Sequence, residues 1–234
     1  MGEALLWGAV AASSLVVGAV LGLVWRWPAQ LVGAVLAFGA GALISAVSFD
    51  LAEEGARAGG YTLMAIGLGV GGLTYLIADW LVQRAAGGGG EDPGPALALG
   101  AFLDGIPEQM VLGIGIAAGN GVSASLLIAV FVSNLPEAIG SVAGMRQEGR
   151  RSPAILGLWV AVAVVCTVAS VAGFLLADVT ASSMTAAING FAAGALLVML
   201  VDSMIPDAAK DTGRWAGIIT VLGFALGAGL TSVG

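Results

Sequence analysis

The chain has 234 residues, of which 59% are hydrophobic and only 10% are charged, and its mean hydropathy is +1.01. This composition excludes a water-soluble globular domain and indicates a polytopic membrane protein. No extramembrane catalytic domain fits in what remains, so we expect no enzyme. Histidine is absent and Cys166 is the single cysteine, which excludes an intrachain disulfide and removes the commonest transition-metal ligand.

Eight apolar segments are long enough to span a bilayer, and they predict an all-α fold in one transmembrane domain over residues 1–234. The first segment carries Glu3 and lacks a basic start, so we expect a retained helix and not a signal peptide. The predicted spans are about 3–24, 29–50, 61–83, 96–118, 122–145, 153–176, 184–207 and 213–233.

The basic residues predict the orientation of the chain. Only Arg57 follows an even-numbered segment, and the other seven follow segments one, three, five and seven. The positive-inside rule then places the odd-numbered connections in the cytoplasm and both termini outside, for a protein of the plasma (inner) membrane. The seven residues are Arg26, Arg84, Arg146, Arg150, Arg151, Lys210 and Arg214.

Segments two and seven share a pattern, Phe-x-Ala-Gly-Ala-Leu, which begins at Phe38 and again at Phe191. On the predicted topology the two copies run in opposite directions. This predicts three helices, a central pair and three more helices related as an inverted repeat, with the substrate at the interface of the repeats. Acids at the ends of the two segments are expected to flank the ion pathway: Asp50, Glu53 and Glu54 at the outer mouth, and Asp202 and Asp207 at the inner one.

The central pair carries two matching polar motifs. Asp104 and Glu108 lie one helical turn apart inside an apolar segment, where each acid costs roughly 2.5–3.5 kcal/mol to insert. Pro107 removes a backbone donor and frees the Leu103 carbonyl, as in the broken helices that form ion sites in transporters. A similar motif, Ser133-Asn134-Leu135-Pro136-Glu137, lies 29 positions further on.

Side-chain oxygens of this kind suit hard or borderline divalent cations. If all three acids are ionised, a divalent ion leaves one net negative charge, which favours a retained proton or a second cation. The other interpretation is that the acids hydrogen-bond to each other or to backbone and hold the helices together. The candidate metal ligands are Asp104, Glu108, Ser133, Asn134 and Glu137.

These two motifs resemble the ZIP family of divalent metal (zinc/iron) transporters. Helix four of that family typically reads His-Asn-x-Pro-Glu-Gly and helix five His-x-x-Pro-Glu-Gly. Here Asp104 and Ser133 replace the histidines, and Gln109 and Ala138 replace the glycines. The resemblance implies eight helices, a divalent metal ion as transported substrate, no cofactor, and a homodimer in the bilayer, and Asp207 after Pro206 resembles the family's acidic cytoplasmic exit.

Two other functions fit the same residues. One is a proton-coupled carrier of a small solute, although no Arg or Lys lies inside a predicted span to hold an anion. The other is a non-transporting relative that serves as a sensor or partner protein, suggested by the missing histidines. For a transporter, a site made of oxygen ligands shifts the relative preference from zinc toward manganese, iron(II) or magnesium.

Overall fold

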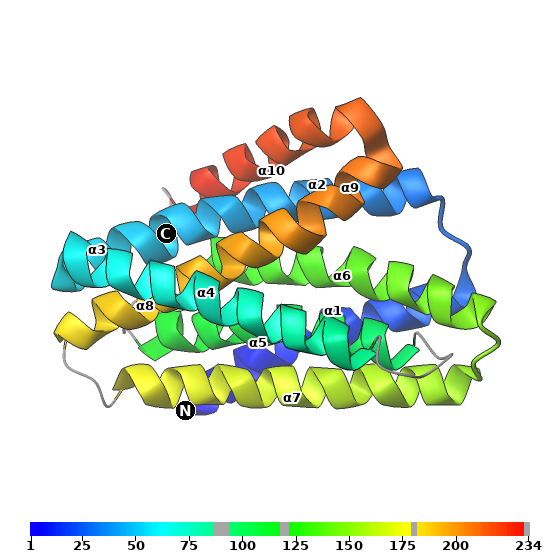
Figure 1. The fold of residues 1–234 in the computed structure, drawn as a ribbon, viewed down its shortest axis with the longest axis horizontal. Coiled ribbons are helices and arrows are strands. Elements are labelled where there is room, and N and C mark those ends of the chain that lie inside the picture. Colours follow the sequence, from blue (N-terminus) through cyan, green and yellow to red (C-terminus); the bar gives the residue numbers. More distant parts are fainter. Residues whose placement is uncertain (87–93, 118–121, 179–181, 232–234) are drawn as a thin grey trace.

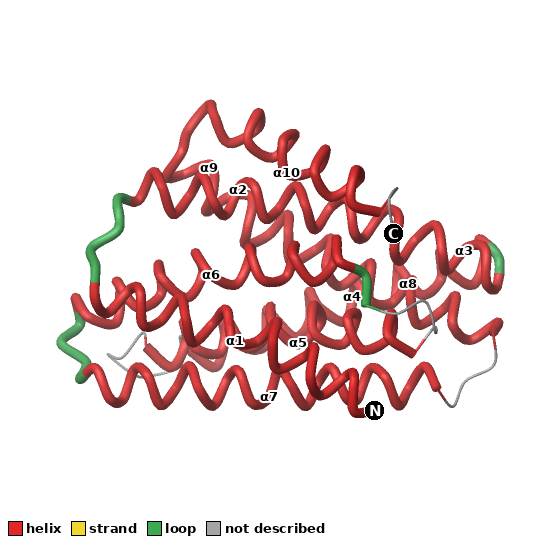
Figure 2. The backbone as a smooth tube through the Cα atoms, turned by 180° about the vertical axis from the view of Figure 1, so that it is seen from behind, coloured by secondary structure: helices red, strands yellow, loops and turns green. Residues whose placement is uncertain are grey.

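The computed structural model of this protein describes residues 1–86, 94–117, 122–178 and 182–231, and this part of the chain is helical with no β-strand. Figures 1 and 2 show the helices packed side by side along one long axis, with the N-terminus and the described end of the C-terminal helix at the same end. The helices are α1 (Gly2–Val24), α2 (Ala29–Ala46), α3 (Glu54–Gly59), α4 (Tyr61–Ala86), α5 (Gly94–Ala117), α6 (Ala124–Gln147), α7 (Ser152–Asp178), α8 (Ser182–Met199), α9 (Ile205–Thr212) and α10 (Ala216–Thr231).

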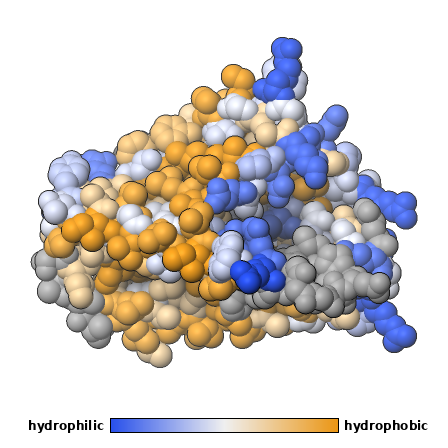
Figure 3. Space-filling view, in the orientation of Figure 1, coloured by the Kyte–Doolittle hydropathy of each residue, from blue (hydrophilic) through white to orange (hydrophobic). Residues whose placement is uncertain are grey.

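Helical stretches in the described residues include six that are long and apolar enough to cross a membrane. Their outer surfaces are apolar as well, since Val24, Leu6 and Val221 are each at least 60% exposed. In Figure 3 apolar side chains cover much of the visible face, and hydrophilic ones gather toward the right-hand end. The protein is therefore a multi-pass membrane protein. The six stretches are Gly2–Val24, Ala29–Gly59, Tyr61–Arg84, Ala124–Arg146, Ser152–Ala177 and Met184–Thr231.

The helices pack in two groups. In the first group, α1 contacts α6 and α7, and α5 packs along α7. In the second, α2 packs along α10 and against α9, while α4 packs along α8. The groups meet where α2 touches α6 and α5 touches α8, so the central helices α5 and α6 belong to the first group but face the second.

Glycines bring helix backbones into direct contact within each group. A Cβ at Gly41 of α2 would collide with the Thr220 carbonyl of α10, and one at Gly223 would collide with the Phe38 carbonyl. Between α4 and α8 the same role falls to Gly71 and Gly194. Since lipid gives helices no hydrophobic reason to associate, such close backbone packing is a main source of their attraction.

Two short π-helical segments interrupt the longest helical stretches. One runs from Val47 to Glu53 (η1) after α2, and the other from Leu200 to Met204 (η2) after α8. Their first residues are 153 positions apart, the same separation as between Phe38 and Phe191. In Figure 1, α2 runs from right to left and α8 from left to right, so the two stretches that share this pattern have opposite directions, as the sequence predicts.

The expected break at the central prolines is wrong. α5 continues as an α-helix across Pro107 and α6 across Pro136. The irregular backbone lies instead in the two π-helical segments, which form where one extra residue per turn is accommodated and which often mark functional sites. A proline removes one hydrogen bond but does not force a helix to end when neighbouring helices hold both sides of it.

Candidate metal site between α5 and α6

Two of the predicted ligands meet directly across the central pair. The Ser133 hydroxyl of α6 lies 3.2 and 3.4 Å from the two carboxylate oxygens of Glu108 on α5, and 3.0 Å from the Val130 carbonyl. Both side chains are only 2% exposed. The pairing places one carboxylate and one hydroxyl oxygen at a single buried point between α5 and α6.

The second helix group closes this point from the other side. A Cβ at Gly39 of α2 would lie 3.0 Å from the Ser133 Cα and 3.2 Å from the Met204 methyl carbon of η2. Gly39 therefore lets α2 approach Ser133, and the π-helical segment brings a thioether to the same place. The site lies where α2, α5, α6 and η2 come together.

Two buried amides beside the motifs have no hydrogen-bond partner among the described residues. Asn134 and Gln109 are each 0% exposed, and neither the oxygen nor the nitrogen of either side chain is satisfied. A buried polar atom left in this way costs roughly 1–3 kcal/mol, so such groups are rarely kept without a ligand, a water or an ion. Asn134 lies one turn before Ala138, which packs on Gly18 of α1, so it faces the interior of the first group.

Cys166 of α7 packs against α5 at Gly105. A Cβ at Gly105 would be 2.7 Å from the Cys166 sulfur, and this thiol is buried. Cys166 therefore packs against α5 in the turn before Glu108. Glu137 is half-buried on α6, and both glutamates have further polar or electrostatic contacts.

Asp104 lies in α5 one turn before Glu108, but its side chain is outside the described part of the chain. Where side chains are described, no three His, Cys, Asp or Glu residues lie close enough together to hold a metal ion. The prediction that three carboxylates converge therefore stays a prediction that depends on Asp104. Ser133 and Asn134 remain the predicted neutral ligands of the candidate site.

Asp50, predicted at the outer mouth, is part of a hydrogen-bond network. It accepts from Ser123 at 2.8 Å and from Ser125 at 2.7 Å, and Thr231 donates to Ser125 at 3.1 Å. Because Ser123 is also the N-cap of α6, the network joins η1 to the start of α6 and the end of α10.

The other predicted pathway acids lie nearer the surface. Glu53 is exposed and pairs with Arg57 one turn later, and Glu54 is half-buried with a polar or electrostatic contact of its own. Asp202 and Asp207 are exposed on η2 and α9.

Sequence reasoning missed four groups around these residues. Gln109 was noted only as a departure from the family motif, although a buried amide beside an intramembrane glutamate is itself a signal. The N-cap role of Ser123 follows from a serine just before an apolar run. The contacts of Met204 and Cys166 have no local signal, because they depend on which helices become neighbours.

Comparison with known proteins gives two matches. A family model described as ZIP zinc transporter matches residues 94–233, which include both proline motifs. A proposed zinc transporter of Arabidopsis thaliana is 27% identical over 182 residues, which cover 74% of this chain. The chain spans only 29% of the length of that plant protein.

Proposed function

The chain belongs to the ZIP zinc transporter family, a family of transporters and not of enzymes, and from this premise we propose that it carries divalent metal cations across a membrane. The ion is the substrate, and the protein needs no cofactor. The observation that carries the proposal is the buried contact between Ser133 and Glu108 across α5 and α6.

The ion binds between these two helices, with Glu108 and Glu137 as charged ligands and Ser133 and Asn134 as neutral ones. Asp104 completes the set from the turn before Glu108. The unsatisfied amide of Asn134 supports this assignment, because a bound cation gives its oxygen the partner that the protein does not provide. The Ser133 hydroxyl can donate its proton to Glu108 and still offer an oxygen lone pair to the ion.

The proposed architecture is eight spans in a 3+2+3 inverted repeat within a single domain. Such a repeat exchanges α1 with α7, α2 with α8, α4 with α10, and α5 with α6. Under this exchange the α2–α10 contact corresponds to the α4–α8 contact, and the α1–α6 contact corresponds to the α5–α7 contact. The matched positions of η1 and η2 support the same exchange. The site then lies on the pseudo-two-fold axis, where an ion can be reached from either side.

The orientation that we propose has both termini outside and the basic end in the cytoplasm, in the plasma membrane and in a homodimer. Asp50, Glu53 and Glu54 then attract cations to the outer mouth, and Asp202 and Asp207 receive them at the inner one. The Asp50 network ties three helical elements at the outer end and would have to rearrange when that mouth opens.

The test is metal-dependent stabilisation of the purified protein against heat, with Mn²⁺, Fe²⁺ and Zn²⁺. A ligand at 100 times its dissociation constant stabilises the folded protein by about 2.7 kcal/mol, so the midpoint of thermal unfolding should rise clearly. Glu108→Gln should lose this rise, and Glu3→Gln, which changes an exposed acid at the start of α1, should keep it. A full metal response in Glu108→Gln would refute the site.

The variant Asn134→Leu tests whether Asn134 is a metal ligand or has only a structural role. Replacing an unsatisfied buried amide by an apolar side chain of similar size is expected to leave the metal-free protein equally or more stable. The same variant should weaken metal stabilisation. If it lowers the thermal midpoint of the metal-free protein and leaves the metal-dependent rise intact, Asn134 has a structural role only.

A further inference from the structure

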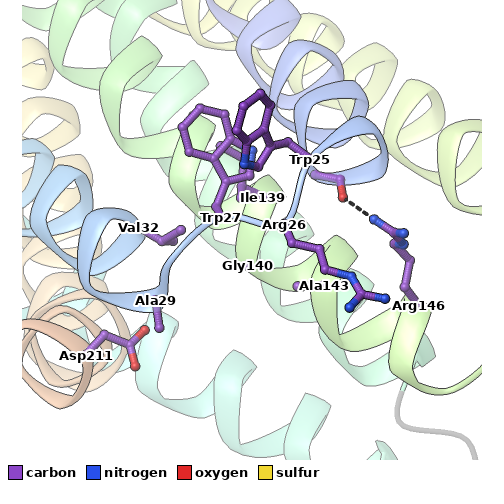
Figure 4. Close-up of a pocket in the computed structure, with 11 residues that line it drawn as sticks. Trp25, Arg26, Trp27, Ala29, Val32, Ile139, Gly140, Ala143, Arg146 and Asp211 are labelled. Carbon is purple, nitrogen blue, oxygen red and sulfur yellow. Dashed lines mark hydrogen bonds between the residues drawn. The ribbon is translucent and has the colours of Figure 1, made fainter.

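A cavity lies away from the candidate metal site, at the end of the molecule where α1 passes into α2. Its volume is about 600 Å³. One wall is the link between α1 and α2, another is the C-terminal half of α6, and the third is α9 (Figure 4). The cavity thus opens between the two helix groups, and it contains none of the proposed metal ligands.

Two arginines line this cavity without a carboxylate partner. Arg146 donates to the Gly22 and Leu23 carbonyls at 3.0 and 3.1 Å, which fixes its guanidinium at the end of α1. Arg26 extends past Ala143 in Figure 4. Neither arginine forms an ion pair within the described residues, and the one acid of the lining, Asp211, lies on the α9 side.

Arginine offers a fork of donors that matches the oxygens of a phosphate group. Two such groups in one cavity at the end of a membrane helix therefore point to an anionic ligand. A net charge of one positive unit remains after Asp211 is counted, so the cavity attracts an anion even without rearrangement.

The rest of the lining is apolar and aromatic. Val32, Ile139 and Ala143 form its inner wall, and Trp25 and Trp27 lie at the rim with ring centres 6.5 Å apart. Trp25 is 68% exposed, and Trp27 donates to the Leu21 carbonyl at 3.1 Å. Tryptophans in this position are typical of the level of lipid headgroups, so the ligand has an apolar part as well as a charged one.

We propose that this cavity binds an anionic glycerophospholipid, with the phosphate between Arg26 and Arg146 and the start of the acyl chains against Val32 and Ile139. Basic pockets between membrane helices are known sites for such headgroups. A free phosphate ion offers the same oxygens to the arginines but nothing to the apolar wall, so the lipid is the better match.

The experiment measures the thermal midpoint of the purified full chain in nanodiscs of phosphatidylcholine with increasing fractions of phosphatidylglycerol. Phosphatidylglycerol should raise the midpoint of the parent. Arg26→Gln should require roughly fivefold more of this lipid, the change expected when one basic side chain no longer contacts the bound anionic headgroup. Arg214→Gln is the matched control, because Arg214 is an exposed arginine that stacks on Trp215 outside the cavity.

A second variant fills the cavity without changing its charge. A Cβ at Gly140 would meet only Val32, at 3.9 Å, so Gly140→Leu should fold and occupy the space of the acyl chains. It is expected to lose most of the phosphatidylglycerol response. Arg146→Gln is a weaker test, because it also removes the two hydrogen bonds that hold the end of α1.

Three results would overturn the proposal. The first is that the thermal midpoint in pure phosphatidylcholine equals the midpoint with phosphatidylglycerol, which would mean that the anionic headgroup is not recognised. The second is an unchanged lipid response in both Arg26→Gln and Gly140→Leu. The third is full stabilisation of detergent-solubilised protein by millimolar inorganic phosphate alone, which would assign the cavity to a free anion and not to a lipid.

Discussion

At the scale of single residues, the chemistry of the candidate site depends on what occupies two motif positions. Asp104 and Ser133 stand where the family motif has histidine, so the ligands that we propose at these two positions are oxygen atoms. Imidazole nitrogen is the softer ligand and suits zinc, whereas carboxylate and hydroxyl oxygens suit manganese and magnesium. The Ser133 hydroxyl is buried and donates to the Glu108 carboxylate.

The corresponding prediction concerns metal preference. The double variant Asp104→His, Ser133→His should bind zinc more tightly relative to manganese than the parent does, because imidazole replaces two oxygen ligands. Calorimetry with both metals on both proteins measures the ratio. Zinc still ranks above manganese at any given site, so the parent is expected to show weak discrimination and not reversal. Equal zinc-to-manganese ratios in parent and variant would contradict the argument from ligand softness.

At the scale of helices, which helices pack together depends on where a glycine, having no side chain, allows another backbone to approach closely. The pairs α2–α10 and α4–α8 are closed by glycines that lie against carbonyl oxygens of the facing helix. The same helix α4 also contains Gly69, which has no atom within 4 Å of its would-be Cβ. Two glycines of one helix therefore have opposite roles in the packing.

This contrast gives a prediction within α4. Gly69→Ala should stabilise the protein by up to about 1 kcal/mol, because alanine loses less backbone entropy in a helix than glycine does. Gly71→Ala should destabilise it by about 1–3 kcal/mol or more, because the added methyl group collides with the Phe191 carbonyl. Thermal midpoints of the two variants measured side by side test the sign. A stabilised Gly71→Ala would mean that α4 and α8 do not pack this closely.

At the scale of the whole molecule, the two ends differ in charge. The positive-inside rule applied to the basic residues predicts which end is cytoplasmic. In Figure 1 the link from α6 to α7 lies at the opposite end from the link between α3 and α4. The two links should therefore be on opposite sides of the membrane.

Labelling with a membrane-impermeant maleimide tests this prediction. Tyr61→Cys, at a position 78% exposed at the start of α4, should react in intact cells. Ser152→Cys, exposed at the start of α7, should react only after the cells are opened. Cys166 is buried, so the parent chain is the unlabelled control. Reaction of Ser152→Cys alone in intact cells would reverse the proposed topology.

Much of this protein can be predicted from sequence because lipid imposes a simple rule on the chain. Backbone groups in hydrocarbon must bond within their own helix, so long apolar runs predict helices, as α1, α4 and α7 illustrate. The acids that interrupt such runs stand out for the same reason, which is how Glu108 and Glu137 were found. The shared Phe-x-Ala-Gly-Ala-Leu pattern also predicted the opposite directions of α2 and α8.

Only the tertiary structure decided which faces of these helices meet. The contact of Ser133 with Glu108, the approach of Gly39 and Met204 to it, and the network around Asp50 join residues far apart in the chain. Apolar side chains around the whole circumference of a helix carry no signal for which face is buried. Close backbone packing at glycines selects the neighbours instead. The structure also shows that α5 and α6 continue as α-helices across prolines that, read from sequence alone, predicted a break.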